Sequence, residues 1–566
     1  MQRFHREWSW MILLLCLLVL GGSIFGYVRA AGDPYEAVGE GFRTFGTVYK
    51  KVYEGYVQEE DPKVLITAAI HGMLEELDPY TQFLDKKLSI DQLRIDTTGE
   101  YGGLGISIDM KDGVPIVVSP FEGTPAYNVG LRAGDRIVKI EGEPTRGKTL
   151  DEVVSILRGP PGTSVTITVE REGDPQPSDY TIVRDLIKLK AVTLAEKIAD
   201  DIGYVRLAKF SQVAGNELEE ALRRLQSQGI KGLILDLRAN PGGLLSEACD
   251  VADKFLEKGQ LIVSTKGRQA DQNRDYPAQN DPVLDKDIPL VVLVNQGSAS
   301  ASEIVAGAIQ DHDRGLILGQ PTFGKGSVQT IQLINETARL KLTTALYYTP
   351  SGRSIHRPER GPINGEADST ALGQRFFTDH GRTVYGEGGI SPDMEVKAMP
   401  LTRLTRALER ERIFFDFAVH YAVVHPDINE KFDVDDEVLA EFEDYVSSPK
   451  VGFEYPFAGQ PQIQELEGIV EEEGYGEDVQ GALTALKSVL KEQKRTDFKR
   501  NRDYIRMAIR REIASRMWGS EARLRATFPE DRQLQKAIEL LKDPTLYARK
   551  IEETSVAIGK RKTGAQ

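Results

Sequence analysis

The pattern of apolar and polar residues changes character several times along the chain, which predicts separate domains. Residues 33–98 carry apolar side chains at helical spacing, so we expect an N-terminal helical region there. The apolar positions that define this spacing are Phe42, Phe45, Val48, Val52 and Tyr56. From residue 99 to 190, short apolar runs alternate with glycine and proline. That texture predicts a compact β-rich module.

The next part of the chain alternates between strand and helix patterns. Continuous apolar runs recur between residues 191 and 398, each followed by a helical stretch. The runs cover residues 204–210, 233–237, 290–295 and 315–318. Apolar runs of this kind indicate strands buried on both faces, so we expect an α/β core around a mostly parallel sheet. Residues 399–566 are almost uniformly helical and charged in pattern, which predicts a C-terminal helical domain.

The first 32 residues have the pattern of an export signal or a signal anchor. Arg3, His5 and Arg6 precede an apolar run over residues 8–28. The arginine within Val28-Arg29-Ala30 makes a poor cleavage site. Since the run reaches the roughly 20 residues that a membrane-spanning helix needs, we favour a retained anchor over a cleaved signal. The rest of the chain is then expected in the cell envelope, in the periplasm or another extracytoplasmic space.

Composition narrows the functional classes. A chain of 566 residues is too long for one hydrophobic core, and its net charge of −15 argues against nucleic-acid binding. Cys16 lies in the apolar run, so Cys249 is the one cysteine of the exported part, which rules out an intrachain disulfide there. With seven scattered histidines and no H-E-x-x-H motif, we predict no metal and no cofactor.

The densest chemical signal is a run of small residues directly after a buried apolar stretch. Residues 295–303 read Asn-Gln-Gly-Ser-Ala-Ser-Ala-Ser-Glu and open a predicted helix. A serine at a strand-to-helix turn exposes its hydroxyl, and helix N-terminal amides face developing negative charge. Small residues that only cap and pack a helix explain the run equally well. The chemistry alone does not choose among Ser298, Ser300 and Ser302.

A second signal is Lys325, which stands between two glycines in the loop 321–329. Burial lowers a lysine pKa from about 10.4, and a neutral amine beside a serine is a known base for peptide hydrolysis. An exposed loop lysine is the plain alternative, and the phosphate-binding G-x-x-x-x-G-K-[ST] pattern is missing. His312 and His356 offer a Ser-His-Asp triad, but without a G-x-S-x-G motif we expect both to be structural.

These segments resemble the carboxyl-terminal processing (tail-specific) serine peptidase family. In that family the nucleophile and the lysine lie 25 residues apart, and here 325 − 300 = 25. The resemblance implies that Ser300 is the nucleophile, Lys325 the general base and Gln329 the residue that orients the lysine. It also implies a crotonase/ClpP-like fold for residues 191–398, within a multidomain α+β protein.

The resemblance extends to the backbone amides that would stabilise an oxyanion. Residues 235–243 read Leu-Asp-Leu-Arg-Ala-Asn-Pro-Gly-Gly and match the family's strand and turn at this place. The implied donors are the amide of Gly242 or Gly243 and the amide of Ala301. A plain Asn-Pro-Gly-Gly turn explains the same residues.

The β-rich module resembles a PDZ domain. Its carboxylate-binding loop falls on residues 101–106, Tyr-Gly-Gly-Leu-Gly-Ile. Amides in such a loop hold a terminal carboxylate while the peptide adds to the sheet as a strand. The implied peptide contacts are Gly103, Leu104, Gly105 and Ile106, and Arg158 resembles a family arginine that links peptide docking to the active site. A glycine-rich strand start with no ligand is the alternative.

We therefore predict a serine endopeptidase that recognises the C-terminal or nonpolar tails of exported proteins through its PDZ domain and cleaves them. The main alternative is an inactive PDZ scaffold or adaptor. A non-peptidase acyl hydrolase on a crotonase-like sheet would leave the PDZ module unexplained. Expected partners are protein or peptide substrates, the membrane, and, as candidates, an adaptor or activator protein and further copies of the chain.

Overall fold

The computed structural model describes residues 34–357, 374–386, 388–429 and 431–556. The predicted export signal or anchor over residues 8–28, with Cys16, lies outside these ranges. Within them, no helix is both long enough and apolar enough to cross a bilayer. The chain divides into two units, residues 1–83 and 84–566.

The first unit is helical, as the apolar spacing predicts. It contains α2 (Pro34–Gly55) and α3 (Pro62–Glu75). Helix α3 begins where the Asp61 carboxylate accepts a hydrogen bond from the Lys63 N–H at 2.8 Å. Several large apolar side chains of α2, Phe42 among them, are exposed.

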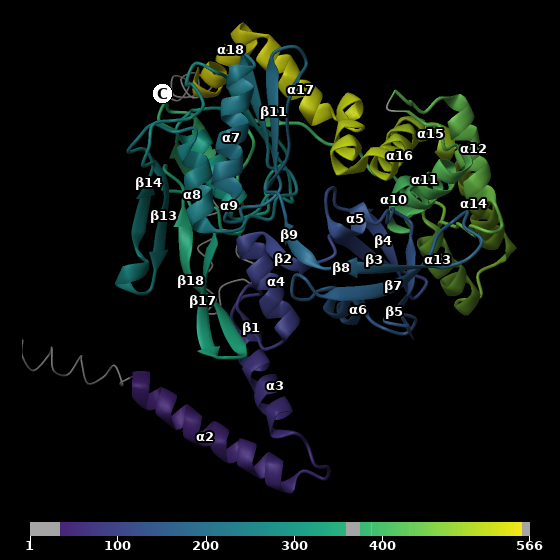
Figure 1. Ribbon diagram of the computed structural model, residues 1–566, viewed down its shortest axis with the longest axis horizontal. Coiled ribbons are helices and arrows are strands. Elements are labelled where there is room, and N and C mark those ends of the chain that lie inside the picture. The colour runs from purple at the N-terminus through teal and green to yellow at the C-terminus, as the bar shows by residue number, and fades with distance from the viewer. Residues whose placement is uncertain (1–33, 358–373, 387, 430, 557–566) are drawn as a thin grey trace, which may run out of the picture. The chain divides into compact units, whose positions relative to one another are not determined.

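The second unit opens with the β-rich module (Figure 1). Its main sheet is antiparallel, in the order β3-β4-β5-β7-β8, with β6 (Glu143–Pro144) beside β5. The strands are β3 (Ile106–Lys111), β4 (Val114–Pro120), β5 (Arg136–Ile140), β7 (Ser164–Glu170) and β8 (Ser178–Val183). Helix α6 (Leu150–Leu157) starts with a capping box between Thr149 and Glu152. Strand β3 stands at one edge of the sheet, where another strand has room to pair.

Shorter elements frame this module. They are α4 (Lys87–Thr98), β2 (Glu100–Gly103), α5 (Pro125–Asn128) and β9 (Asp185–Lys188). Strands β2 and β9 pair with each other in antiparallel fashion. The loop between β2 and β3 is therefore held at both ends by paired strands.

A six-stranded sheet forms the centre of the α/β core, in the order β10-β11-β12-β15-β16-β21. The strands are β10 (Val192–Ile198), β11 (Ile202–Leu207), β12 (Gly232–Asp236), β15 (Leu290–Val294), β16 (Leu316–Gly319) and β21 (Met394–Glu395). All neighbours from β11 onward are parallel, and only β10 is antiparallel to its partner. Every residue of β12 and β15 is buried, which explains their uninterrupted apolar sequence.

Helices cover one face of this sheet and a second sheet adjoins it. The helices are α7 (Ala214–Ser227), α8 (Leu245–Asp253) and α9 (Ala301–Asp311), packed on side chains such as Leu233, Leu235 and Val292. The second sheet is antiparallel and contains β13 (Leu261–Gly267), β14 (Arg274–Pro277), β17 (Ser327–Asn335) and β18 (Ala338–Tyr348). A small hairpin, β19 (Arg375–Phe377) with β20 (Thr383–Tyr385), follows it. The predicted fold class is confirmed.

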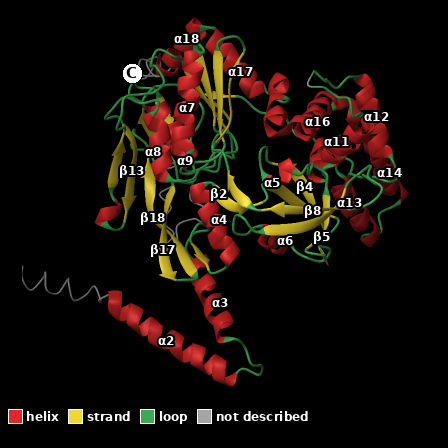
Figure 2. Ribbon diagram, in the orientation of Figure 1, coloured by secondary structure: helices red, strands yellow, loops and turns green. Residues whose placement is uncertain are grey.

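The C-terminal part is helical, as predicted, and divides into two groups of helices (Figures 1 and 2). The helices of the first group are α10 (Arg403–Arg410), α11 (Ile413–Val424), α12 (Asp436–Ser447), α13 (Gln460–Glu472), α14 (Glu477–Lys494), α15 (Asp497–Arg500) and α16 (Arg502–Arg525). Helices α10, α11, α12 and α16 of this group surround an apolar core of their own. The second group is α17 (Arg532–Lys542) and α18 (Pro544–Val556).

Helices α17 and α18 cover the other face of the central sheet. Leu534, Ala537 and Leu540 pack on the strand residues that point away from α7, α8 and α9, such as Ile234 and Val291. Each of these side chains is fully buried. The last helices of the chain are thus a structural layer of the α/β core, a role that the sequence pattern did not reveal.

We expect Leu534→Ala to lower the free energy of unfolding of the full-length chain by about 2–5 kcal/mol, because it leaves a cavity under the sheet. Urea denaturation followed by circular dichroism measures the change. The matched control is Leu466→Ala on α13, where the leucine is 45% exposed. Equal stability of the two variants would show that α17 is not part of the core.

Candidate active site

Ser300 stands at a sharp turn between strand β15 and helix α9. Its backbone has φ 55° and ψ −111°, a region that side-chain-bearing residues rarely adopt. Such strain at a strand-to-helix turn is typical of nucleophile elbows. The turn persists because the Ser300 N–H donates to the Glu303 carboxylate at 2.8 Å.

The structure distinguishes the three serines of this segment. The Ser298 hydroxyl donates to the Leu237 carbonyl at 2.8 Å, and the Ser302 hydroxyl donates to the Asn240 carbonyl at 2.9 Å. Both side chains are fully buried and have structural roles. The Ser300 side chain instead lies near the side chain of Tyr347 on β18, whose pKa burial raises to about 12.

The carboxylate of Glu303 joins the serine turn to the lysine loop. Besides the Ser300 N–H, it accepts the N–H groups of Gly324 at 2.7 Å and Lys325 at 2.9 Å. The Thr322 hydroxyl donates to it at 2.6 Å. Burial raises the pKa of Glu303, and these four hydrogen bonds oppose the rise. The two motifs that the sequence marks separately therefore share one buried acceptor.

Lys325 is half-buried, and the glycines beside it are needed for close approach. Gly324 has φ 93°, and a Cβ there would lie 3.0 Å from the Arg357 Cβ. A Cβ on Gly326 would lie 2.5 Å from the His356 backbone nitrogen. Larger residues on either side would displace the lysine, which explains the Gly-Lys-Gly sequence.

Gln329 lies on β17, four residues after Lys325. Its amide donates to the Ser327 hydroxyl at 2.9 Å and to the Thr343 hydroxyl at 3.3 Å. These contacts hold the glutamine side chain against its own strand, β17, and the paired strand β18. Its role in orienting Lys325 stays a prediction.

The turn after β12 approaches Ser300 directly. Gly242 has φ 97°, and a Cβ at this position would lie 2.9 Å from the Ser300 Cβ. Asn240 builds the turn: its side-chain amide donates to the Leu207 carbonyl at 2.8 Å, and its own carbonyl accepts the Ala299 N–H at 3.0 Å. The turn and the serine elbow are thus bonded into one unit.

Hydrogen bonding separates the candidate oxyanion donors. The Gly242 N–H donates to the Asn240 side-chain oxygen at 2.9 Å, so it is already engaged. The amides of Gly243 and Ala301 donate no hydrogen bond to any residue that the structure describes. Of the two glycines left open by the sequence, Gly243 is therefore the better donor.

The two histidines occupy other positions. His312 caps the far end of α9, and 11 residues of helix correspond to about 16 Å from Ser300. Its ring contacts the Leu261 carbonyl and the Asp379 carboxylate, each at 2.7 Å. His356 lies with its backbone against Gly326. The geometry of His312 is that of a structural residue.

Four family models match consecutive parts of the chain. The N-terminal domain of the activating protease CtpB matches residues 27–88, and a PDZ domain matches 116–171. Peptidase family S41 matches residues 201–362. The C-terminal helical domain of probable PDZ-proteases matches 404–541.

A carboxy-terminal-processing protease of Bartonella bacilliformis is 48% identical over 315 residues, which are 55% of this chain and 71% of the relative. The chain belongs to the carboxyl-terminal processing peptidases of family S41. A probable CtpA-like serine protease of Staphylococcus aureus is 38% identical over 312 residues, 55% of this chain and 61% of the relative. Among solved structures, the photosystem II D1 C-terminal processing protease is 29% identical, with a TM-score of 0.36. The match covers 61% of this chain and 85% of the chain in that structure.

Membership in this peptidase family confirms that the chain is a serine peptidase with a PDZ domain. This finding favours the enzyme over the inactive scaffold and over the acyl hydrolase.

The PDZ loop of this S41 peptidase makes a tight backbone turn that requires glycine. Gly105 has φ 77°, and a Cβ there would lie 2.3 Å from the Thr124 Cβ. The Leu104 side chain is buried, while the Leu104 and Gly105 amides donate to none of the described residues. Gly103 ends strand β2 and Ile106 begins the edge strand β3.

Arg158 lies beside this PDZ loop at the end of α6. Its guanidinium is 5.2 Å from the centroid of the Tyr101 ring, and one of its nitrogens donates to the Gln92 side chain at 3.3 Å. These contacts tie the end of α6 to the start of the loop. A link from Arg158 to the active site stays a prediction.

Sequence reasoning gave no role to Glu303, Asn240 or Tyr347. The spacing of Ser300 and Glu303 is that of a capping box, so the sequence does contain a signal for Glu303. Asn240 precedes Pro-Gly-Gly, a usable signal for a turn-building side chain. Nothing local in the sequence places Tyr347 near Ser300.

We expect Glu303→Gln to lower the free energy of unfolding by about 2–4 kcal/mol, because a side-chain NH₂ group cannot accept the hydrogen bonds that one carboxylate oxygen now receives. Peptidase activity should fall about a hundredfold as the serine and lysine segments lose their common anchor. Urea denaturation and a cleavage assay measure the two effects. Glu220→Gln, on the exposed side of α7, is the control. Unchanged stability and activity of Glu303→Gln would contradict this role.

Proposed function

We propose that the protein is an endopeptidase with a Ser300–Lys325 dyad that cleaves the C-terminal or nonpolar tails of exported proteins. The observation that supports it best is the shared carboxylate of Glu303, which accepts the backbone amides of both Ser300 and Lys325. One rigid anchor keeps the serine turn and the lysine loop in a constant relation, as a nucleophile and its base require.

In this mechanism Lys325, in its neutral form, takes the proton of the Ser300 hydroxyl. The Ser300 oxygen attacks the scissile carbonyl carbon, and the amides of Gly243 and Ala301 donate to the resulting oxyanion. Lys325 then protonates the departing amine as the peptide bond breaks. A water molecule, deprotonated by Lys325, releases the acyl group and restores Ser300. Gln329 is proposed to orient Lys325.

Substrate selection is proposed to reside in the PDZ domain. The amides of the 103–106 loop bind the terminal carboxylate, and the peptide pairs as a strand with the open edge of β3. Arg158 stacks over Tyr101 just before that loop. We propose that Arg158 couples peptide binding in the PDZ domain to the active site.

The apolar run over residues 8–28 supports an extracytoplasmic location, with the chain anchored in the inner membrane. An adaptor or activator protein and further copies of the chain are proposed as additional partners. The exposed apolar side chains of α2 support an association between copies of the chain.

Cleavage of an unfolded protein with a nonpolar C terminus should disappear in both Ser300→Ala and Lys325→Ala. The first variant lacks the nucleophile and the second lacks the base. The cleavage rate of each should therefore fall at least a thousandfold, on the order known for dyad and triad residues. Gel electrophoresis and mass spectrometry follow the products. Lys286→Ala, which removes an exposed lysine of the same core, should cleave at the wild-type rate. Activity that survives in Lys325→Ala would refute the dyad.

Peptide binding should depend on a free terminal carboxylate. With Ser300→Ala protein to prevent cleavage, we expect a peptide with a nonpolar tail to bind about tenfold or more weakly when its C terminus is amidated, since the loop amides then lose a charged acceptor. Fluorescence anisotropy measures both affinities. Gly105→Ala is expected to weaken the binding of the free acid as well. Equal affinities for acid and amide would exclude carboxylate recognition.

A further inference from the structure

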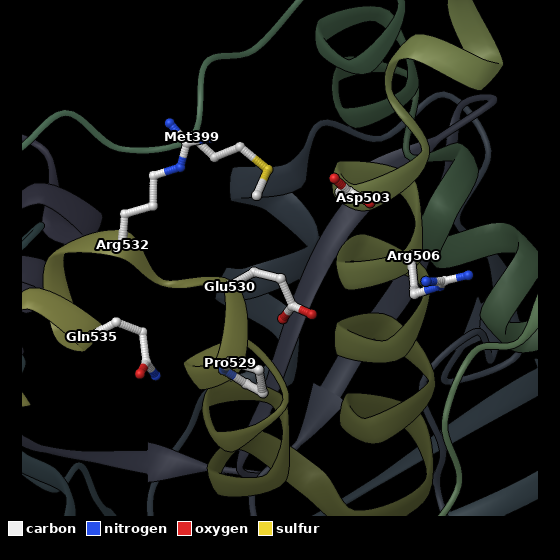
Figure 3. A pocket seen from close by; sticks show the side chains of 7 residues that line it. All are labelled: Met399, Asp503, Arg506, Pro529, Glu530, Arg532 and Gln535. Carbon is white, nitrogen blue, oxygen red and sulfur yellow. The ribbon is translucent and has the colours of Figure 1, made fainter.

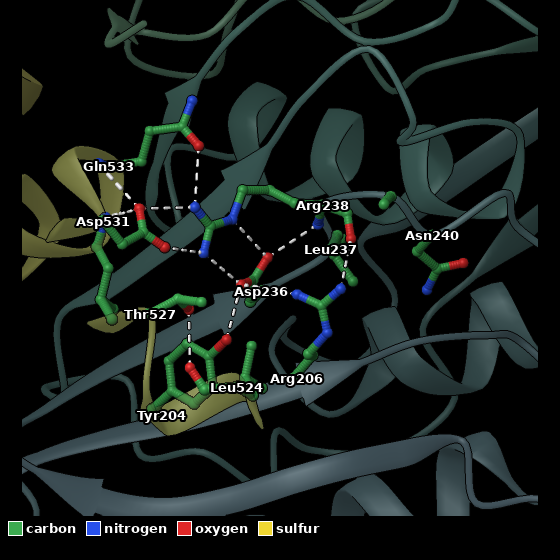
Figure 4. Close-up of polar contacts among 12 residues, drawn as sticks. Tyr204, Arg206, Asp236, Leu237, Arg238, Asn240, Leu524, Thr527, Asp531 and Gln533 are labelled. Atoms are coloured by element: carbon green, nitrogen blue, oxygen red, sulfur yellow. Dashed lines mark hydrogen bonds and ion pairs between the residues drawn. The ribbon is translucent and has the colours of Figure 1, made fainter. Parts of the chain in front are cut away.

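Arg238, which directly precedes the turn that approaches Ser300, contacts the C-terminal segment (Figure 4). Two nitrogens of the Arg238 guanidinium contact the Asp531 carboxylate, Nη1 at 2.9 Å and Nη2 at 2.7 Å. Nη1 also donates to the Gln533 side-chain oxygen at 3.0 Å. These partners lie 293 and 295 residues further along the chain.

Arg238 is at the same time fixed to the central sheet through Asp236. Its Nε and Nη2 donate to the two Asp236 oxygens at 2.9 and 2.6 Å. Asp236 is fully buried and also accepts the Tyr204 hydroxyl at 2.7 Å. Burial raises the pKa of Asp236, but the attraction of Arg238 and Arg206 outweighs it, so the carboxylate stays charged. The guanidinium therefore bridges two carboxylates, one at the end of β12 and one at the N-cap of α17.

The start of α17 is itself fixed on the side of Arg238. Asp531 caps the helix by accepting the Gln533 and Leu534 N–H groups at 3.1 and 3.0 Å. The Gln533 amide donates to the Val396 carbonyl at 2.7 Å. On another side this segment borders a cavity of about 300 Å³, lined in part by Glu530, Arg532 and Gln535 (Figure 3). The contacts with Arg238 thus add to the apolar packing of α17 in fixing this segment.

The residues after Arg238 carry this constraint to the nucleophile. Ala239 has φ 55°, an unfavourable conformation, and its N–H donates to the Asn295 side chain at 2.9 Å. Asn240 bonds the serine elbow, and Gly242 lies against Ser300. A strained turn keeps its shape only where its surroundings over-determine it.

We propose that Asp531 and Gln533 are positioning residues for the active site, which act through Arg238 to hold the 239–243 turn in the shape that presents an oxyanion amide beside Ser300. The catalytic part of this inference rests on the proposed function, since it assigns the turn to the oxyanion. The C-terminal helices would then complete the active site of the peptidase core as well as cover its sheet.

The test compares full-length Asp531→Asn with Asp543→Asn. Asparagine is also a good helix cap, so Asp531→Asn keeps the start of α17 and removes only the charge that faces Arg238. Asp543 accepts the Leu546 N–H at 3.0 Å in the next helix and is exposed, which makes it the matched control. Two quantities are measured: kcat and KM for cleavage, and hydrogen exchange of peptides that cover residues 237–244.

In Asp531→Asn we expect kcat to fall about tenfold at unchanged KM, and exchange of the 239–242 amides to quicken about tenfold, as expected for losing a half-buried charge-assisted hydrogen bond. Asp543→Asn should match the wild type in both. The inference is overturned if Asp531→Asn matches the wild type, or if its activity loss only follows a general loss of protection throughout the chain. If Ser300→Ala still cleaves while the exchange difference persists, the dyad fails and the positional link stands.

Discussion

The candidate active site depends on one buried carboxylate. Glu303 is fully buried, and a charge in such a place is unfavourable unless it is fully hydrogen-bonded. Four donors satisfy it, and they come from the serine elbow and from the 322–325 loop. Three of these donors are backbone amides and the fourth is a buried hydroxyl. The carboxylate therefore fixes the main chain of the serine elbow and of the lysine loop relative to each other. Thr322 extends the network to Ile390, whose N–H donates to its hydroxyl at 2.6 Å.

Much of this arrangement is encoded locally, and those parts are visible in the sequence. The Ser-Ala-Ser-Ala-Ser-Glu and Gly-Lys-Gly segments follow buried strands, so the pattern of strands alone places both at the same edge of the sheet. The helix cap at Thr149 and the glycine loop at residue 105 follow equally from local rules. The sequence left Gly242 and Gly243 as alternatives, because only the Asn240 side chain decides which amide is engaged.

The remaining features depend on contacts between distant segments. Nothing in the amphipathic pattern of α17 says which surface it covers, and only the folded chain shows Leu534 and Leu540 on the central sheet. The pairing of Arg238 with Asp531 is likewise invisible to any local pattern, since surface charges are common in both segments. The first group of C-terminal helices also contacts the PDZ domain: Lys111 of β3 pairs with Asp416 at 2.5 Å, and Arg412 pairs with Asp109. The C-terminal region therefore contacts both the PDZ domain and the peptidase core.

The most direct test of the account is covalent labelling of the nucleophile. A small fluorophosphonate forms a stable adduct with an activated serine hydroxyl, and peptide mapping by mass spectrometry locates it without any knowledge of the substrate. The account predicts a single adduct on Ser300 in the wild type and much slower labelling when Lys325 is replaced by alanine. An adduct on Ser298 or Ser302, or an equal labelling rate without the lysine, would contradict it.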